Sequence, residues 1–215
     1  MTEGYEFMIW GRKTYIKRME RRHVEEMQLW GEHTDPVFFS YTMPKMNKKQ
    51  KDYWFSKKTY SFTRKCFVVF NHQNELVGYI SLRNIKWVRK SSELGIVFDP
   101  NKLSCGYGTD SLKSFIRYYF ETMNMKRLVL RVAEFNIRAQ KCYLNCGFTI
   151  EGTYYNEFED PNLPVFSEAN LEDYRRYFLL ENNILKCRFI HMFITKEMYL
   201  QNKENYPHYP PNTCA

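Results

Sequence analysis

The sequence predicts one α/β domain in which a mixed sheet of about six to seven strands carries helices on both faces. Two features of its 215 residues predict this class. Short apolar runs rich in β-branched and aromatic residues follow one another in the first half, whereas strand-like and helix-like segments alternate in the second half. A hydrophobic content of 44% and a charged content of 26% are those of a globular protein with one sizeable core. We therefore expect a single domain over residues 1–200 and a tail over residues 201–215.

The first half is expected to form an antiparallel meander. Its strands are residues 15–19, 66–70, 76–82 and 93–98. Turn-like residues between the second and third of these strands predict a hairpin. The fourth strand ends at Asp99-Pro100, because proline cannot donate to a central ladder. Residues 22–30 keep a roughly helical apolar spacing, and residues 47–58 suit a solvated basic helix with one aromatic edge.

The second half contains the clearest helix of the chain, over residues 111–123. One face of it carries apolar residues at the spacing i, i+3, i+4, i+7, i+8, namely Leu112, Phe115, Ile116, Tyr119 and Phe120. A strand at 127–132, a helix at 137–146 and strands at 148–155 and 187–195 follow. A right-handed crossover through the 111–123 helix would make the sheet mixed. Residues 156–186 form an insertion before the last strand, with a helix expected near residues 171–180.

The composition disfavours several classes of protein. No run of about 18 apolar residues occurs and the first residues lack an apolar leader segment, so we expect a cytoplasmic protein without a membrane span. The six cysteines show no metal-ligand spacing, which predicts reduced thiols and no metal site. The formal net charge of +8 suits nucleic acid, an anionic membrane or a phosphate-rich ligand without choosing between them.

Two glycines stand just before the clearest helix. Gly106-Tyr107-Gly108 follows a strand and a short loop, so its backbone N–H groups and the partial positive charge of the helix N-terminus would favour an anion. Ser111 occupies the third glycine position of a dinucleotide fingerprint, and no Gly-Lys-Ser/Thr of a P-loop follows. The motif alone therefore fits either a phosphate site or a plain glycine-containing loop.

A second motif lies at residues 136–148, N-I-R-A-Q-K-C-Y-L-N-C-G-F. On its own it reads as a helix with an Asn cap at its start and a Gly at its end. Together with the glycine loop, however, it resembles the Q/R-x-x-G-x-G/A and N-x-x-A-x-x-x-Y-x-x-x-G-F elements of the GNAT acetyltransferases, nearest to the RimJ/RimL-like and spermidine acetyltransferase-like branches. The resemblance spans about residues 76–152, and Leu103 departs from it at the Gln or Arg position.

This resemblance implies a GNAT-like fold with a splayed central strand, and acetyl-CoA as cosubstrate. The pantetheine arm is expected along Ile96, Val97 and Phe98, and Asn136 is expected to hold the cofactor backbone. The phosphates are expected at the loop residues Leu103, Ser104, Cys105, Gly106, Tyr107, Gly108 and Thr109. Basic residues near this loop would neutralise phosphate charge: Lys102, Lys113, Arg138 and Lys141.

Acetyl transfer to an amine needs a neutral amine, a polarised thioester and a proton for the departing thiolate. By its match to the family tyrosine, Tyr143 is the candidate general acid, although its place on an apolar stripe also suits a core residue. Glu93 is the candidate general base, because it is the carboxylate beside the expected splay. Glu134 and His191 are alternatives, and an amine that is already neutral would need no base.

The acceptor side is indicated by a local reversal of charge. Residues 142–174 contain no Lys or Arg but seven acids: Glu151, Glu157, Glu159, Asp160, Glu168, Glu172 and Asp173. By analogy with the family this region borders the acceptor cleft, so an acidic strip there would attract a cationic amine, such as a polyamine or a basic N-terminal peptide. A solvated acidic loop is the simpler alternative. The resemblance also admits a homodimer.

Two further functions remain open at this level. One is a basic RNA- or ribosome-associated binding module, which would use the lysines of residues 48–58 with interleaved aromatic residues. We expect an amine acceptor rather than nucleic acid to be the partner of this protein. The other is a GNAT-like sensor that keeps acyl-CoA binding without catalysis, which Leu103 favours slightly and Tyr143 disfavours.

Overall fold

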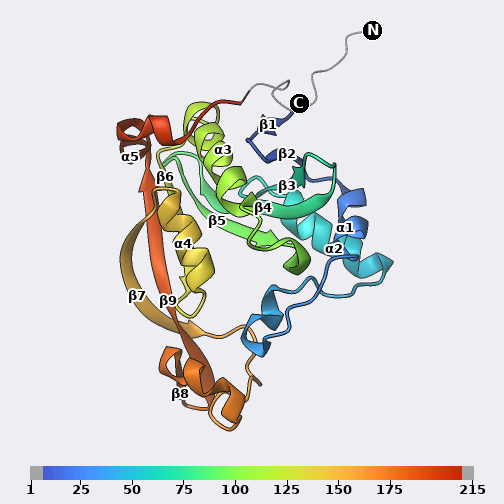
Figure 1. Cartoon of the computed structure of the whole chain (residues 1–215), viewed down its shortest axis with the longest axis vertical. Coiled ribbons are helices and arrows are strands. Elements are labelled where there is room, and N and C mark those ends of the chain that lie inside the picture. The colour runs from blue at the N-terminus through green and yellow to red at the C-terminus, as the bar shows by residue number, and fades with distance from the viewer. Residues whose placement is uncertain (1–6, 210–215) are drawn as a thin grey trace.

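The computed structural model describes residues 7–209, and these form one sheet with helices on both sides (Figure 1). The sheet has nine strands in the described residues: β1 Ile9–Trp10, β2 Thr14–Arg18, β3 Lys65–Asn71, β4 Leu76–Lys86, β5 Ser91–Phe98, β6 Arg127–Ala133, β7 Thr149–Glu157, β8 Phe178–Glu181 and β9 Ile184–Thr195. The α-helices are α1 Arg21–Met27, α2 Lys48–Thr59, α3 Tyr107–Glu121, α4 Ile137–Asn145 and α5 Lys196–Gln201.

The strands follow the order β1-β2-β3-β4-β5-β6-β9-β7, with β8 paired to β9 beyond the end of β6. Every pairing is antiparallel except that of β5 with β6, which the crossover through α3 makes parallel. The expected mixed sheet, with its antiparallel first half, is therefore confirmed. The strand number exceeds the expected six to seven because β1 and β8 are too short, at 2 and 4 residues, to give a periodic signal.

Alternate side chains of the central strands enter two separate cores. In β3, Phe67 and Val69 pack into the core under α3, whereas Val68 and Phe70 pack against the residues of α1 and the segment after it. The α3 core contains the apolar face that the sequence indicated, and Leu112, Phe115 and Tyr119 are fully buried there. The two cores explain why β3 is apolar at nearly every position rather than alternating.

The junction of β5 with β6 is short, and it opens into a wedge. Parallel pairing covers only Ser91–Glu93 of β5 against Arg127, Leu128 and Val129 of β6. Beyond this point β5 continues to Phe98 beside β4, while β6 stays beside β9. Within residues 7–209, the edge of β5 from Leu94 onward therefore faces the wedge without a partner strand. Its backbone groups on that side are available to an extended ligand.

Two segments differ from their expected structure. The helix near residues 171–180 is instead the 3-10 segment Ala169–Tyr177 followed by strand β8. Phe178 is buried, and it lies opposite Cys187 of β9, so long-range pairing overrides the local helical tendency. Helix α3 begins at Tyr107, four residues before the expected start, which places the glycine motif in its first turn.

The C-terminal tail is docked on the domain as far as it is described. Tyr206 is buried, and its hydroxyl donates to the carbonyl oxygen of Cys146 at 2.9 Å. Arg117 also donates to the carbonyl oxygen of Pro207. The remainder of the expected tail, residues 210–215, lies outside the described residues. None of the described helices is long and apolar enough to cross a membrane.

Candidate active site

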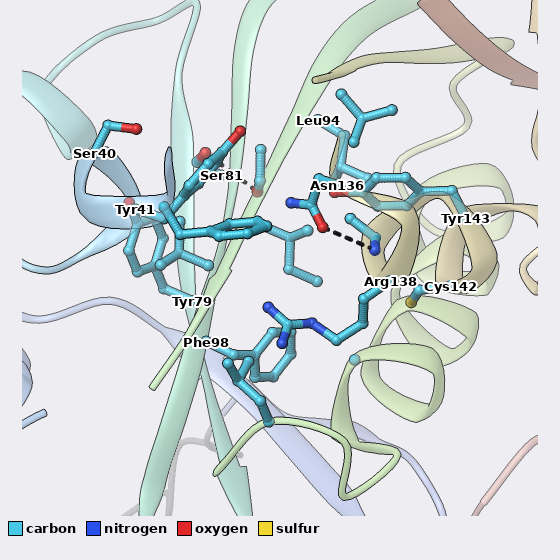
Figure 2. A pocket seen from close by; sticks show the side chains of 18 of the residues that line it. Ser40, Tyr41, Tyr79, Ser81, Leu94, Phe98, Asn136, Arg138, Cys142 and Tyr143 are labelled. Carbon is cyan, nitrogen blue, oxygen red and sulfur yellow. Dashed lines mark hydrogen bonds between the residues drawn. The ribbon is translucent and has the colours of Figure 1, made fainter. Parts of the chain in front are cut away.

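A cleft of about 680 Å³ occupies the wedge between β5 and β6 (Figure 2). One half of it is bounded by β5, the loop before α3 and helix α4. The other half is bounded by β4, helix α2, the segment at residues 38–44 and the end of β7. The cleft thus joins the glycine loop to the acidic region in one continuous space.

The loop before α3 is shaped to bind an anion. Ser104 and Gly106 both have positive φ angles, 62° and 82°, and both line the cleft. Helix α3 starts immediately afterwards and adds its N-terminal partial charge. The one acid of this first turn, Asp110, accepts hydrogen bonds from the turn between β1 and β2. Its carboxylate is therefore directed away from the glycine loop.

The cleft brings together most of the residues that the sequence analysis predicted to be catalytic or cofactor-binding. Its lining includes Ile96, Val97, Phe98, Leu103, Ser104, Gly106, Tyr107, Gly108, Thr109, Asn136 and Tyr143. Two nominated residues, Cys105 and Glu93, are not among the lining residues. Cys105 is exposed on the outer side of the loop, where its backbone carbonyl accepts a hydrogen bond from Lys13 at 3.1 Å.

The basic residues near the loop have different roles. Arg138 lines the cleft and extends its guanidinium group into it, as Figure 2 shows, and Lys141 lies on the same wall. Lys102 also lines the cleft, but its ammonium group is bound by Glu75 at 2.8 Å, and Lys113 is not part of the lining. Arg138 and Lys141 are therefore basic side chains on the wall of the cleft, whereas Lys13 contacts the glycine loop at Cys105.

Tyr143 is held rigidly in the wall of the cleft by helix α4. Asn136 caps this helix, its side-chain oxygen accepting a hydrogen bond from the backbone N–H of Ala139 at 3.1 Å. The ring of Tyr143 is 8% exposed and packs edge-on against Phe148. Burial raises the pKa of its hydroxyl above the ordinary value, so the phenol keeps its proton at neutral pH. A protonated phenol in the cleft wall can donate a hydrogen bond to a ligand there, although the raised pKa makes it a weaker acid.

Glu93 forms ion pairs with two arginines. Its carboxylate accepts from Arg83 at 3.0 Å and from Arg131 at 2.8 Å, and Asn84 donates to its second oxygen. These partners outweigh the effect of burial and lower the pKa of Glu93. A carboxylate with a lowered pKa is a weaker base, so the geometry favours a structural role for Glu93.

The two alternative bases, Glu134 and His191, also interact with other side chains outside the cleft. Glu134 forms an ion pair with Arg188, and Nδ1 of His191 donates a hydrogen bond to the carboxylate of Glu151 at 2.8 Å. Neither Glu134 nor His191 lines the cleft.

Replacing Glu93 by Gln is expected to lower the free energy of unfolding at pH 7 by about 1–3 kcal/mol, because two guanidinium groups lose their shared counter-ion. Since the folded-state pKa is lowered, the contribution is complete above the ordinary pKa of Glu and disappears as the pH falls through the lowered value. Urea unfolding from pH 7 down to pH 3 measures both effects. The exposed Glu181 of the Lys186 pair provides a control, and Glu181→Gln should leave the midpoint unchanged.

Sequence reasoning missed the opposite half of the cleft. Trp54 and Lys58 of α2, Tyr79, Ser81 and Arg83 of β4, and Arg131 of β6 all line it. The spacing of Trp54 and Lys58 at i, i+4 was the available signal, because it places the lysine on the aromatic edge of α2 rather than on its solvated face. The strand residues share one face by alternation, but only the pairing of β4 with β5 brings them to the cleft.

Comparison with known proteins finds relatives among the acetyltransferases. A sequence profile of the acetyltransferase (GNAT) domain matches residues 13–149. The spermidine N(1)-acetyltransferase of Vibrio cholerae is 26% identical over 153 residues, which are 65% of this chain and 84% of the relative. The ribosomal-protein-serine acetyltransferase of Escherichia coli is 28% identical over 88 residues, 41% of this chain and 49% of that protein.

A solved structure shares the fold. The spermidine/spermine N-acetyltransferase SpeG from Vibrio cholerae, in complex with manganese ions, superposes with a TM-score of 0.63 at 20% identity, covering 88% of this chain and 96% of that one. The profile match extends over more than half of the chain and includes the glycine loop, Tyr143 and most of the wedge. On these grounds the chain belongs to the GNAT family and is an N-acetyltransferase.

Proposed function

We propose that this enzyme transfers an acetyl group from acetyl-CoA directly to a primary amine, with both substrates in the cleft together. The observation that supports the proposal is the wedge itself, an open edge of β5 that leads from the N-terminus of helix α3 to the phenol of Tyr143. The cleft extends without interruption from the glycine loop to β4 and α2, so cosubstrate and acceptor can meet inside it.

The residues present fit acetyl-CoA. The free edge of β5 from Leu94 to Phe98 would pair with the amide groups of the pantetheine arm as an added strand would. The backbone N–H groups around Gly106, with Arg138, would hold the phosphates. When bound there, acetyl-CoA supplies the activated acyl group as a thioester. Tyr143 would then donate its proton to the departing sulfur.

The acceptor amine is proposed to react from its neutral fraction, because Glu93 is engaged by Arg83 and Arg131. The value of kcat/KM should then rise with pH until the pKa of the acceptor amine is reached, and its midpoint should follow that pKa when acceptors of different basicity are compared. A midpoint that stays fixed among acceptors would instead reveal a titrating base on the enzyme.

The acidic region supports an acceptor whose amine arrives charged. Of its seven acids, Glu157 and Glu159 line the cleft, in the half that is bounded by β4, α2 and the end of β7. Glu151 is instead bound by Arg127 and His191 outside it. The two lining carboxylates would attract an ammonium group before it loses its proton. Spermidine is the substrate in the names of three relatives, one from Vibrio cholerae and two from strains of Escherichia coli, and a polyamine or an N-terminal amine is therefore the starting class for a screen.

The proposed function is tested by calorimetric titration with acetyl-CoA, with CoA and with an adenine nucleotide that lacks the pantetheine arm, followed by an acetylation screen. We expect acetyl-CoA to bind in the micromolar range and the truncated nucleotide to bind much more weakly. The screen should contain polyamines, basic peptides and amino acids. The absence of cosubstrate binding, or binding without acetylation of any amine, would contradict the proposal.

A further inference from the structure

Lys58 lies in the cleft wall, where Glu159 attracts it electrostatically without forming an ion pair with it. Its ammonium group lies over the rings of Trp54 and Tyr79, at 5.2 Å and 5.5 Å from their centroids. No ion pair or hydrogen bond within residues 7–209 includes it. Burial lowers the pKa of this lysine. An ammonium group held by ring faces and by a carboxylate that does not pair with it is stabilised only weakly, and an anion in direct contact would stabilise it far more.

Arg83 extends the same basic surface along β4. It follows Tyr79 and Ser81 on one face of the strand, by alternation, and all three line the cleft. The guanidinium group shares the carboxylate of Glu93 with Arg131, so two cations face one anion. The Nε atom of Arg83 is buried and makes no hydrogen bond within the described residues. An unused N–H donor in a buried position is costly unless a ligand accepts from it.

These observations leave an excess of positive charge on one wall. Lys58, Arg83 and Arg131 are three cations on this wall, where Glu93 pairs with both arginines and Glu159 attracts Lys58 without forming an ion pair with it. A polyamine carries only positive charges, and it would meet like charges along β4 and α2. A small molecule with an amine at one end and a carboxylate at the other would match both walls.

We propose that the acceptor carries a carboxylate as well as its amine, and that Lys58, together with Arg83, binds this carboxylate. The inference rests on the proposed acetyl transfer and assigns the acceptor to the amino carboxylates. Lys58 donates a charge-assisted hydrogen bond to the carboxylate, and the positive charge of Arg83 on the same wall adds to the attraction. Lys58 is then a residue that determines specificity and takes no part in proton transfer.

The test compares acceptors that differ only in a carboxylate: ornithine with putrescine, and lysine with cadaverine. For the wild type we expect kcat/KM to be about 10- to 100-fold higher for each amino acid than for its diamine, the range of a hydrogen bond to a charged group. Lys58→Gln should remove this preference by lowering kcat/KM for the amino acids, whereas Lys58→Arg should preserve most of it. The ratio within one variant does not depend on how much of the enzyme is folded.

Lys57 provides the matched control, because it is the next residue of α2 and its ammonium group lies over the exposed ring of Tyr53. Lys57→Gln should leave the ratio at its wild-type value. A wild type that acetylates the diamines at least as well as the amino acids would overturn this inference, and so would an equal loss for both classes in Lys58→Gln. Either result leaves the proposed function standing, whereas binding of acetyl-CoA without acetylation of any amine would refute both.

Discussion

Replacement of Tyr143 by Phe is expected to lower kcat by about two to four orders of magnitude, while the affinity for acetyl-CoA stays within a factor of about three. The ring would keep its place between Phe148 and the cleft, so the wall and the cap at Asn136 would be unchanged. Only the proton offered to the leaving sulfur would be lost. Steady-state kinetics with saturating acceptor gives kcat, and calorimetric titration gives the affinity.

Tyr199→Phe is the control for loss of a phenol hydroxyl elsewhere. Tyr199 is fully buried under α3 and its hydroxyl donates to Glu121 at 2.7 Å, far along the fold from the lining of the cleft. This change should cost some stability but leave kcat unaltered. If Tyr143→Phe instead retained kcat within about tenfold, a value below the usual range for a general acid, Tyr143 would be a core residue of the cleft wall and another group would protonate the sulfur.

A carboxylate placed in the glycine loop should abolish productive binding of the cosubstrate. Gly108 lies in the first turn of α3, and a β-carbon there would meet Cys142 Sγ and the ring of Phe98 at 3.5 Å, an ordinary contact distance. The fold therefore admits the β-carbon of Gly108→Asp, and Asp is favourable at a helix N-terminus. The dissociation constant for acetyl-CoA is expected to rise at least about 100-fold, because the new charge would compete with the phosphates for the same N–H groups.

Gly108→Ala separates this electrostatic effect from a steric one. It adds the same β-carbon without a charge, so calorimetry should show a change in affinity of less than about fivefold, well under the 1.4 kcal/mol that a factor of ten represents. Both variants should unfold at nearly the wild-type temperature. Equal losses of affinity in the Ala and Asp variants would mean that the loop is merely packed tightly and that phosphates bind elsewhere.

The sequence predicted the elements that carry a strong local pattern. Leu112, Phe115 and Tyr119 repeat at helical spacing, and their burial under the sheet follows from that repeat alone. The glycine loop and Tyr143 were found because each belongs to a compact motif in which spacing is fixed by one turn or one helix. These residues line one half of the cleft.

The other half depends on contacts between distant parts of the chain. Glu93 stands beside the splay as expected, but its chemistry is set by Arg131, 38 residues later in the chain. Phe178 is a strand residue only because Cys187 lies opposite to it. Lys58 reaches the cleft because α2 packs across β3 and β4, which no local pattern encodes. Long-range register was the missing information in each case.

The short junction between β5 and β6 has a consequence for the rigidity of the enzyme. Only three residue pairs connect the antiparallel meander to the second half of the sheet, so the two halves are coupled chiefly through that junction and the helices. The amide protons of β5 that point into the wedge should exchange with solvent faster than those bonded to β4. A pantetheine arm lying along this edge would tie both halves together and slow that exchange. The cosubstrate would then act as a removable strand that completes the sheet during each catalytic cycle.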